Sequence, residues 1–526
     1  MSTYHTIFVG GGINNLVCAA LLAKQGKSVL VLERSEYLGG CIRSEIVEDC
    51  VIDTLSTAYP LFVTSPAYAE LKTDLEKTGL TFVNNSTPTA TVLSDKRFAI
   101  LKTDKAENDK NFNRFYPKEV NRFRGQINWV GENAELLFSF LSQELVSFKI
   151  VKLLAKYIWK NGVTESIRTI GTFLPSVRND FPKHFKSDEL QAVLAPWVLH
   201  TGLSPESPLS STMAKVVAFT IEQVGLPMVK GGSYKIVEAF KQIIETHNGV
   251  CKIQEEIQEI LVDGKGKVSG VRTADNTIYP AINVVASVTP TQLYGRLLKN
   301  SNFIPKPVKS EAKEYKYGMG NMQIHIILNE PPKWFNRELE EVTYVHLSDG
   351  VNAVSKAVNT ARRQILPDKA TICIAQPSAN DPSRSSEGKH ILWIQLPECP
   401  NFPESDGAND LNHLTKGEWT KELKEAYANR IIERISEYIS NIKSACIYKS
   451  IISPLELSQL NINLEHGDPY GGLCEIGQYF AWRPLKSLKN HNTPIKNLYH
   501  GGASTHPGPG LGAGSGYLIA QTILKK

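Results

Sequence analysis

The stretch Thr6-Ile-Phe-Val-Gly-Gly-Gly-Ile-Asn-Asn-Leu-Val-Cys-Ala-Ala-Leu-Leu-Ala-Lys-Gln-Gly-Lys-Ser-Val-Leu-Val-Leu-Glu33 decides how this 526-residue chain folds. Its short apolar run, residues 7–9, predicts a strand that stops at three glycines. A helix of small and aliphatic residues follows, Gly26 ends it, and a second apolar strand finishes on Glu33. Strand, helix and strand in this order form a βαβ unit of minimum length, which indicates an α/β fold.

The residue types in this unit are those that dinucleotide binding requires. Gly10 allows the tight turn from strand to helix, and Gly12 lets backbone N–H groups and the helix N-terminus approach a pyrophosphate. Glu33, at the end of the second strand, can accept hydrogen bonds from a ribose. The third glycine position holds Asn15, which we expect either to set the helix slightly off the strand or to cap it. The alternative, a glycine-rich turn in another kind of α/β protein, is disfavoured because strand, helix, strand and acid fall in order.

Composition and charge exclude several classes of protein. The chain is 42% hydrophobic and 21% charged, which is ordinary for a globular protein, and it is long enough for two or three domains. Its net charge of +5 is not gathered into one basic tract, so no nucleic-acid partner is expected.

The eight cysteines are scattered, with no Cys-x-x-Cys pair and no zinc-like grouping with the twelve histidines. They are therefore expected to be reduced thiols, and no metal site is predicted. Cys41 and Cys50 are too far apart for the redox pair of a flavin disulfide reductase.

The start of the chain and its hydropathy predict a cytoplasmic protein. The first strand begins within six residues of Met1, which leaves no room for a signal or transit peptide, and no window of about 18 apolar residues appears. Peripheral membrane contact stays open, since Lys149, Lys152, Lys156 and Lys160 lie on one face of a helix that also contains Trp159. The alternative is a solvated helix that covers a core.

Two domains are expected. The cofactor domain is discontinuous and comprises residues 1–70, 220–290 and 450–526, and the substrate domain comprises residues 71–219 and 291–449. Helices are predicted at 135–162, 188–200, 234–246, 418–441 and 517–526, and strands at 252–262, 267–273, 283–287, 322–328 and 390–396. The last two strands and the long helix indicate a mixed-sheet and helical substrate domain.

Two further glycine-rich loops extend the binding site beyond the first turn. Gly39 and Gly40 follow Glu33 closely, and Arg43 is placed to meet a phosphate or the polar edge of a flavin, although it could also be a surface arginine. Near the C-terminus, the glycine-crowded residues 501–516 lie between a strand and a helix, where bare N–H groups could stabilise negative charge on a reduced ring.

With these loops in view, the chain resembles the FAD-dependent phytoene-desaturase and β-carotene-ketolase type branch of the amine-oxidase superfamily. The motifs that carry the resemblance are Gly10 to Leu16, Glu33 to Gly40, Gly231-Gly232-Ser233, Val284 to Pro290, Gln478 to Pro484 and Gly502-Ala-Ser-Thr-His-Pro-Gly508. They span nearly the whole chain in the family's order. The resemblance implies a Rossmann-like FAD-binding domain of the glutathione-reductase and amine-oxidase type.

The resemblance also implies which residues hold FAD. They are Gly10, Gly12, Asn15, Glu33, Arg34, Gly40, Arg43, the backbone near Ile257, and, in the last loop, Gly502, Ala503, Ser504, Leu511 and Gly512. Ser504 stands where amine oxidases often carry an acid toward the flavin ribityl chain, and this departure disfavours an amine oxidase.

The implied reaction is hydride transfer from an apolar, isoprenoid- or lipid-like substrate to flavin N5. Candidates for a catalytic group are His506 beside the last loop, His200 near Trp197, and Arg483 beside Trp482. The alternative for each of them is a purely structural role. Three alternatives stay open: a flavin amine or amino-acid oxidase, a non-enzymatic prenyl-protein escort, and an NAD-dependent dehydrogenase. The electron acceptor, the substrate and the direction of the reaction are not identified by the sequence.

Overall fold

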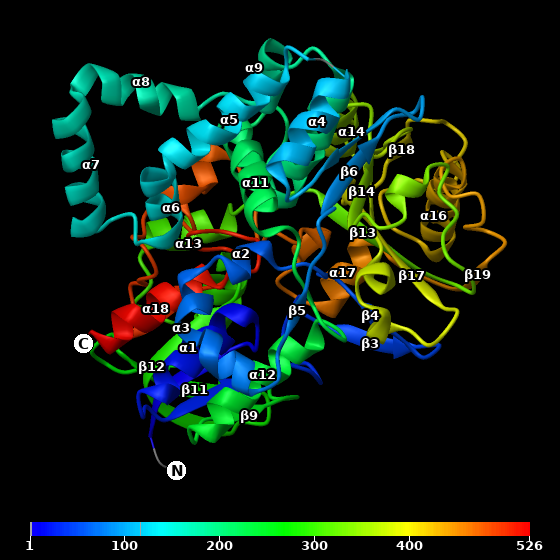
Figure 1. The fold of residues 1–526 in the computed structure, drawn as a ribbon. Helices are drawn as coiled ribbons and strands as arrows, with labels where there is room; N and C mark the ends of the chain where they lie inside the picture. The colour runs from blue at the N-terminus through cyan, green and yellow to red at the C-terminus, as the bar shows by residue number, and fades with distance from the viewer. Residues whose placement is uncertain (1–2, 116, 526) are drawn as a thin grey trace.

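A seven-stranded mixed sheet is built around the N-terminal strand in the computed structural model, which describes residues 3–115 and 117–525 (Figure 1). The strand order is β10-β11-β12-β1-β2-β9, and β20 pairs with β12 off this path. The strands are β1 (Tyr4–Val9), β2 (Val29–Leu32), β9 (Val250–Lys252), β10 (Ile257–Val262), β11 (Val268–Thr273), β12 (Ile278–Ser287) and β20 (Leu498–Gly501). The sheet thus gathers strands from three separate parts of the sequence.

The central strands of this sheet are parallel and buried on both faces. Ile7 is in register with Leu30 of β2 and with Val284 of β12. Burial on both faces explains why β2 reads Val-Leu-Val-Leu without alternation. The strands β10 and β11, which fall within the strands predicted at 252–262 and 267–273, form an antiparallel hairpin that continues the sheet.

Four helices, the N-terminal helix among them, cover one face of the first sheet. They are α1 (Ile13–Lys24), α3 (Pro66–Lys77), α12 (Tyr234–Thr246) and α18 (Gly514–Leu524). The closest approach is between α18 and α1, where the Gly516 N–H donates to Asn14 Oδ1 at 3.2 Å. A Cβ at position 516 would lie 1.8 Å from the Asn14 carbonyl oxygen, so only glycine fits. The last helix of the chain is therefore seated on the start of the first.

A second seven-stranded sheet, at the right of Figure 1, has the order β19-β13-β17-β16-β14-β6-β7. Its strands are β6 (Thr89–Val92), β7 (Phe98–Leu101), β13 (Gly320–Leu328), β14 (Tyr344–Leu347), β16 (Ile372–Ala375), β17 (His390–Cys399) and β19 (Cys446–Ile452). All neighbours are antiparallel except β14 and β6. One face packs on α16 (Lys421–Ser436), and the other packs on a helical layer.

The helical layer and the remaining short elements complete the fold. The helices are α2 (Pro60–Val63), α4 (Lys105–Phe115), α5 (Val120–Glu132), α6 (Ala134–Ser142), α7 (Phe148–Asn161), α8 (Val163–Phe173), α9 (Val177–His184), α10 (Asp188–Leu194), α11 (Ser210–Val224), α13 (Lys306–Lys313), α14 (Val351–Arg362), α15 (Pro377–Asn380) and α17 (Pro454–Leu460). A 3₁₀ helix, η1 (Ala195–Thr201), follows α10, and a π-helical turn, η2 (Thr291–Leu297), follows β12. The two-stranded ladders are β3 (Ser44–Val47) with β4 (Cys50–Asp53), β5 (Phe82–Val83) with β8 (Met228–Val229), and β15 (Ile365–Leu366) with β18 (Ser405–Asp406).

The predicted α/β class is confirmed, while several predicted helices have different bounds. The helix expected over 135–162 is interrupted, and α7 begins after Ser147, whose side chain accepts the Ile150 N–H. The helix expected over 188–200 continues beyond Leu194 as a 3₁₀ helix that carries Pro196 in its first turn. The predicted C-terminal helix begins earlier, at Gly514, and its expected last residue, 526, lies outside the described residues.

Candidate functional site

The carboxyl ends of β1, β2 and β12 open into one long cleft. Open α/β sheets hold their ligands at this end of the strands. Residues within 9–14, 32–41, 255–257, 287–296, 459–471 and 503–511 line the cleft. Nine of the predicted cofactor residues are among them: Gly10, Gly12, Glu33, Arg34, Gly40, Ile257, Ala503, Ser504 and Leu511. Asn15, Arg43, Gly502 and Gly512 lie outside the lining.

The first glycine turn has the geometry that a phosphate-binding loop needs. Gly10 has a φ of 91°, a conformation that side chains with a Cβ rarely adopt. Gly12 is the N-cap residue of α1, and a Cβ built on it would meet no atom within 4 Å. The open space beside Gly12 is the cleft itself, so unpaired N–H groups of the first turn of α1 can reach a ligand there.

Asn15 does not cap α1, because that position is taken by Gly12. The Asn15 side chain is fully buried, and its Nδ2 donates to the carbonyl oxygens of Val9 at 2.9 Å and Gly10 at 2.8 Å. The amide therefore ties the end of β1 to the first turn of α1. A glycine at position 15 would leave the carbonyl groups of Val9 and Gly10 without the amide donor.

Glu33 is held at the cleft wall by three hydrogen bonds. Its Oε2 accepts the Gly11 N–H at 2.7 Å, and its Oε1 accepts both the backbone N–H and the hydroxyl of Ser35 at 2.9 Å. A carboxylate can accept about four hydrogen bonds, so one lone pair remains for a ribose hydroxyl. The side chain both fixes the glycine turn and faces the cleft.

The second glycine loop lies directly against the first. The Gly39 N–H donates to the Gly11 carbonyl at 2.9 Å, and a Cβ on Gly40 would stand 3.4 Å from Gly12 Cα. Arg43 follows this loop but is turned away from the lining. Its guanidinium lies 4.1 Å from the centroid of the Tyr37 ring, and its Nη2 lies 3.0 Å from Glu45.

The C-terminal loop reaches the cleft through Ala503, Ser504 and Leu511. The Ser504 hydroxyl donates to the Gly471 carbonyl at 2.7 Å, which joins the loop to another wall of the cleft. Gly502 has a φ of 98° and lies behind the lining, against Ser287, while Gly512 lies against Leu61.

Arg296 and the segment 459–471 also line the cleft, and sequence reasoning missed both. Arg296 lies in the turn η2, where its Nη1 donates to the Ile257 carbonyl at 3.0 Å. An isolated arginine in this turn carries no motif. The segment 459–471 ends on Gly471, the first residue of the pair Gly471-Gly472, and this glycine pair is a signal that could have been used.

Arg483 is a structural clamp behind the cleft rather than part of its lining. Its Nε and Nη2 donate to the Ala503 carbonyl at 3.0 and 2.8 Å, and Nη2 also donates to the Tyr470 carbonyl at 2.6 Å. The guanidinium is buried and joins the C-terminal loop to the neighbouring loop.

His506 is also buried outside the lining, and burial lowers its pKa to about 3. Its carbonyl oxygen accepts a hydrogen bond from His491 Nε2 at 2.9 Å. The neutral imidazole is buried within the loop between β20 and α18 and does not line the cleft.

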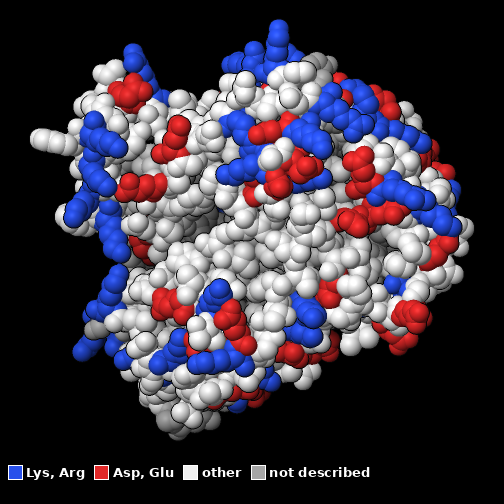
Figure 2. Space-filling view, viewed as in Figure 1, with Lys and Arg blue, Asp and Glu red and all other residues white. Residues whose placement is uncertain are grey.

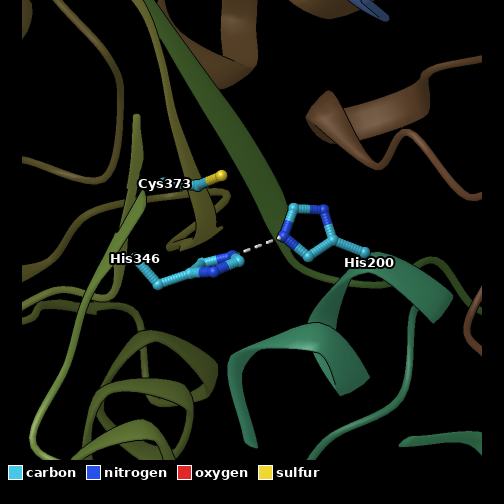
Figure 3. A group of neighbouring side chains, drawn as sticks. All are labelled: His200, His346 and Cys373. Carbon is cyan, nitrogen blue, oxygen red and sulfur yellow. Dashed lines mark hydrogen bonds between the residues drawn. The ribbon is translucent and has the colours of Figure 1, made fainter. Parts of the chain in front are cut away.

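His200 lies beside His346 and Cys373, away from the cleft (Figure 3). His200 comes from η1, and the other two residues face each other in register on β14 and β16. The two Nε2 atoms are 3.0 Å apart, and burial lowers the pKa of His200 to about 4, so one neutral ring donates to the other. The three potential ligand atoms lie within 4.8 Å of one another, and the group could supply two nitrogens and one sulfur to a metal. Because the residues are far apart in sequence, their grouping was not predicted.

A second cavity of about 360 Å³ adjoins the cleft and shares Gln459 and Leu460 with it. It lies between the β3–β4 hairpin and the edge of the second sheet, and its walls are partly apolar. His325 lines it with a buried ring whose Nδ1 lies 3.1 Å from Ser450 Oγ. Burial lowers the pKa of His325 to about 4, so this ring is neutral as well.

Comparisons with known proteins agree with this geometry. Residues 9–73 match the NAD(P)-binding Rossmann-like domain family. Pyridine nucleotide-disulfide oxidoreductase domain-containing protein 2 of Rattus norvegicus is 22% identical over 99% of this chain and 93% of its own. The 4,4'-diapophytoene desaturase of Methylomonas sp is 22% identical over 97% of this chain and 93% of its own. The solved structure of cyclohexylamine oxidase from Brevibacterium oxydans IH-35A covers 100% of this chain and 99% of its own at a TM-score of 0.57 and 13% identity.

The first sheet, its glycine turn and the family match define a Rossmann-like dinucleotide-binding domain, and the chain as a whole has the fold of the solved cyclohexylamine oxidase. Over nearly its full length the sequence is similar to phytoene and diapophytoene desaturases, at 22 to 24% identity. The resemblance inferred from motifs at both ends of the sequence is thereby confirmed.

Proposed function

We propose that the chain binds FAD in the cleft and uses it to oxidise a carbon–hydrogen bond of an apolar, isoprenoid-like substrate. The observation that carries this proposal is the meeting of glycine loops from both ends of the chain at one cleft. Gly39 and Gly40 pack against the first turn, and Gly516 seats the C-terminal loop on Asn14. A domain that binds only NAD needs the first turn alone.

The residues present fit FAD. The space beside Gly12 is open at the N-terminus of α1, where a pyrophosphate would be held. Glu33 keeps an acceptor for a ribose, and the backbone at Ile257 lines the cleft for the adenine. Ala503, Ser504 and Leu511 would border the ring at the other end.

When bound, a flavin supplies a hydride acceptor at N5. The residues of the chain would then orient the substrate carbon and exclude water from the cleft. Arg483 would act as a positioning residue, because it fixes the carbonyl of Ala503 in the cleft wall. His506 and His200 lie outside the lining, so neither is assigned a proton-transfer role.

The substrate class rests on the relatives and on Ser504. Desaturases with phytoene or diapophytoene in their names match nearly the whole chain. The cyclohexylamine oxidase shares the fold at 13% identity, and Ser504 stands where the resemblance to amine oxidases would place an acid. An isoprenoid chain is therefore favoured over an amine.

The first experiment is an absorption spectrum of the purified protein, followed by release and chromatography of the bound nucleotide. We expect flavin bands and stoichiometric FAD. Gly12→Val should abolish both, because the backbone at Gly12 (φ −70°, ψ 162°) suits valine and its new side chain would fill only the cleft. Gly125→Val, at an exposed helix position with nothing within 4 Å, is the matched control. Stoichiometric FAD in folded Gly12→Val would overturn the assignment.

The second experiment separates the competing activities. Under anaerobic conditions, the flavin band should bleach with an acyclic polyene such as phytoene and stay unchanged with putrescine, cyclohexylamine or amino acids. Bleaching by amines alone would favour an amine oxidase. A colourless, folded protein that binds prenylated peptides would favour an escort protein, and reduction of added NAD would favour a dehydrogenase.

A further inference from the structure

The helices α7 and α8 project from the molecule as an L-shaped arm, at the upper left of Figure 1. The arm is fixed at its base on one side by Asn490, whose side chain both accepts the Val146 N–H at 3.0 Å and donates to the Val146 carbonyl at 2.9 Å. On the other side Phe173 packs on Trp129 with ring centroids 5.3 Å apart. Because both ends are held, the arm has a defined orientation.

The two helices pack on each other but leave large apolar side chains in solvent. Within α7, Ile150 is the only buried side chain, so this helix covers little of any core. Trp159 is 92% exposed and Phe148 is 81% exposed. The exposed apolar residues of the arm are Phe148, Val151, Ile158, Trp159, Val163, Ile167, Ile170 and Leu174.

These apolar residues recur at helical spacing. On α8 and its C-cap they lie at 163, 167, 170 and 174, which places them along one face. On α7 they lie at 148, 151, 158 and 159, also on one face, opposite buried Ile150. An exposed apolar stripe on two consecutive helices is larger than the scattered apolar residues of an ordinary surface.

A stripe of lysines borders the apolar face of α7. Lys149, Lys152, Lys156 and Lys160 are all exposed, and their spacing puts them next to the face of Phe148 and Trp159. Figure 2 shows lysine and arginine side chains gathered along this edge of the molecule. Between Phe148 and Phe173 there are five basic residues and one acidic residue, Glu165.

We propose that the α7–α8 arm docks on the surface of an anionic lipid bilayer. Its exposed apolar stripe would enter the headgroup and acyl boundary, where Trp is favoured, while the lysines would contact anionic headgroups. A second copy of the chain is a poorer occupant, because two lysine stripes of the same sign would repel each other. Within the part of the chain that the structure describes, no helix is long and apolar enough to cross a membrane.

The test is flotation of the full-length protein with vesicles of phosphatidylcholine and phosphatidylserine, and with vesicles of phosphatidylcholine alone. Two arm variants remove the two parts of the surface separately: Lys152→Glu, Lys156→Glu and Lys160→Glu in one, and Trp159→Ser, Ile167→Ser and Ile170→Ser in the other. The charge control replaces exposed Lys369, Lys416 and Lys421 by Glu, and the apolar control replaces exposed Ile46, Ile278 and Phe402 by Ser.

We expect the natural protein and both controls to float with the anionic vesicles at low salt. The lysine variant should partition at least about 100-fold more weakly, since each lysine near an anionic surface contributes about fivefold. The apolar variant should partition at least about tenfold more weakly. Salt should weaken binding of the natural protein, because surface charges are screened within about 8 Å at physiological ionic strength.

Equal flotation of the natural protein and both arm variants would overturn the proposal. So would the absence of flotation at low salt, or equal binding to vesicles of phosphatidylcholine alone. If the natural protein self-associates in sedimentation velocity and both arm variants are monomers without any vesicle binding, the occupant is a second copy, which also overturns the bilayer. Circular dichroism of every variant confirms that the fold is retained.

Discussion

Arg384 forms a fully buried ion pair with Asp53, with Nη1 only 2.5 Å from Oδ2. The two residues come from distant parts of the sequence and join the β3–β4 hairpin to the segment that precedes β17. Arg384 Nη2 also donates to the Val229 carbonyl at 2.7 Å, and Asp53 Oδ1 accepts the Ser233 N–H at 2.8 Å. One charge pair therefore holds three segments together between the two sheets.

Replacing Arg384 by Met should lower the free energy of unfolding by about 3 to 5 kcal/mol, because it leaves the Asp53 carboxylate buried without its partner. Arg384→Met combined with Asp53→Asn should recover part of the loss, because the Asp53 charge is removed, whereas Asp381, the second buried carboxylate beside Arg384, keeps its charge. The control is Arg168→Met at an exposed ion pair, which should change stability by at most about 1 kcal/mol. Urea denaturation followed by circular dichroism measures all three, and an unchanged midpoint for Arg384→Met would contradict the prediction.

Asn15 should contribute to stability without being required for the cofactor. Asn15→Gly removes the donors to Val9 and Gly10 and places a second flexible residue in the first turn. We expect a loss of about 1 to 3 kcal/mol in the free energy of unfolding. Denaturation curves test the loss, and the ratio of flavin to protein absorbance tests cofactor retention. A gain in stability would contradict the prediction and would show that the Asn15 side chain destabilises the turn relative to glycine.

Glu33→Ala should weaken FAD binding about 10- to 150-fold, which corresponds to about 1.5 to 3 kcal/mol for hydrogen bonds to a charged group. The loss combines the ribose contact with the release of Gly11 and Ser35. Glu36→Ala, which removes an exposed carboxylate three residues away, is the control and should bind FAD normally. Fluorescence titration of each apoprotein with FAD gives the dissociation constants of both variants.

No cysteine should take part in turnover. All eight cysteines are free, and burial raises the pKa of Cys41 to about 11, so its thiol is protonated near neutral pH and is a poor nucleophile. Cys41→Ser and Cys50→Ser should leave the rate of flavin reduction by substrate unchanged. A variant that keeps FAD but loses reduction would reinstate a thiol mechanism.

Glu398 should make the protein less stable as the pH rises. Burial raises the pKa of this carboxyl from 4.5 to about 8, so the folded state retains a proton that the unfolded state releases. The resulting stabilisation is complete below about pH 4.5 and is lost progressively up to about pH 8. Comparing urea midpoints at pH 6 and pH 9 tests this, because Glu398→Gln should show a smaller decrease than the natural protein. Equal decreases in the two proteins would rule out Glu398 as the source.

Much of the cleft lining was predictable because its signals are local. Gly10, Gly12 and Glu33 act through a turn and a strand end that one short stretch specifies completely. Arg296 and the pairing of His200 with His346 could not be predicted, since each depends on which distant segments the two sheets bring together. The same limit applies to Arg384, which in the sequence is one arginine among polar loop residues.

The α7–α8 arm shows a different limit of prediction from sequence. The lysine spacing predicted the helix correctly, but periodicity cannot tell whether an apolar face is covered or exposed. Exposure depends on α8, which turns away at Gly162 with a φ of 78° and leaves the outer faces of both helices in solvent.

The contact between Gly516 and Asn14 also sets an order of events during synthesis. The first glycine turn is synthesised before its partner loop, because Asn14 and Gly516 are 502 residues apart in the sequence. Any nucleotide that needs both loops can therefore be bound only after Gly516 has left the ribosome. A message that stops short of residue 500 would give a nascent chain with a complete glycine turn but without Ala503, Ser504 and Leu511 in the cleft wall.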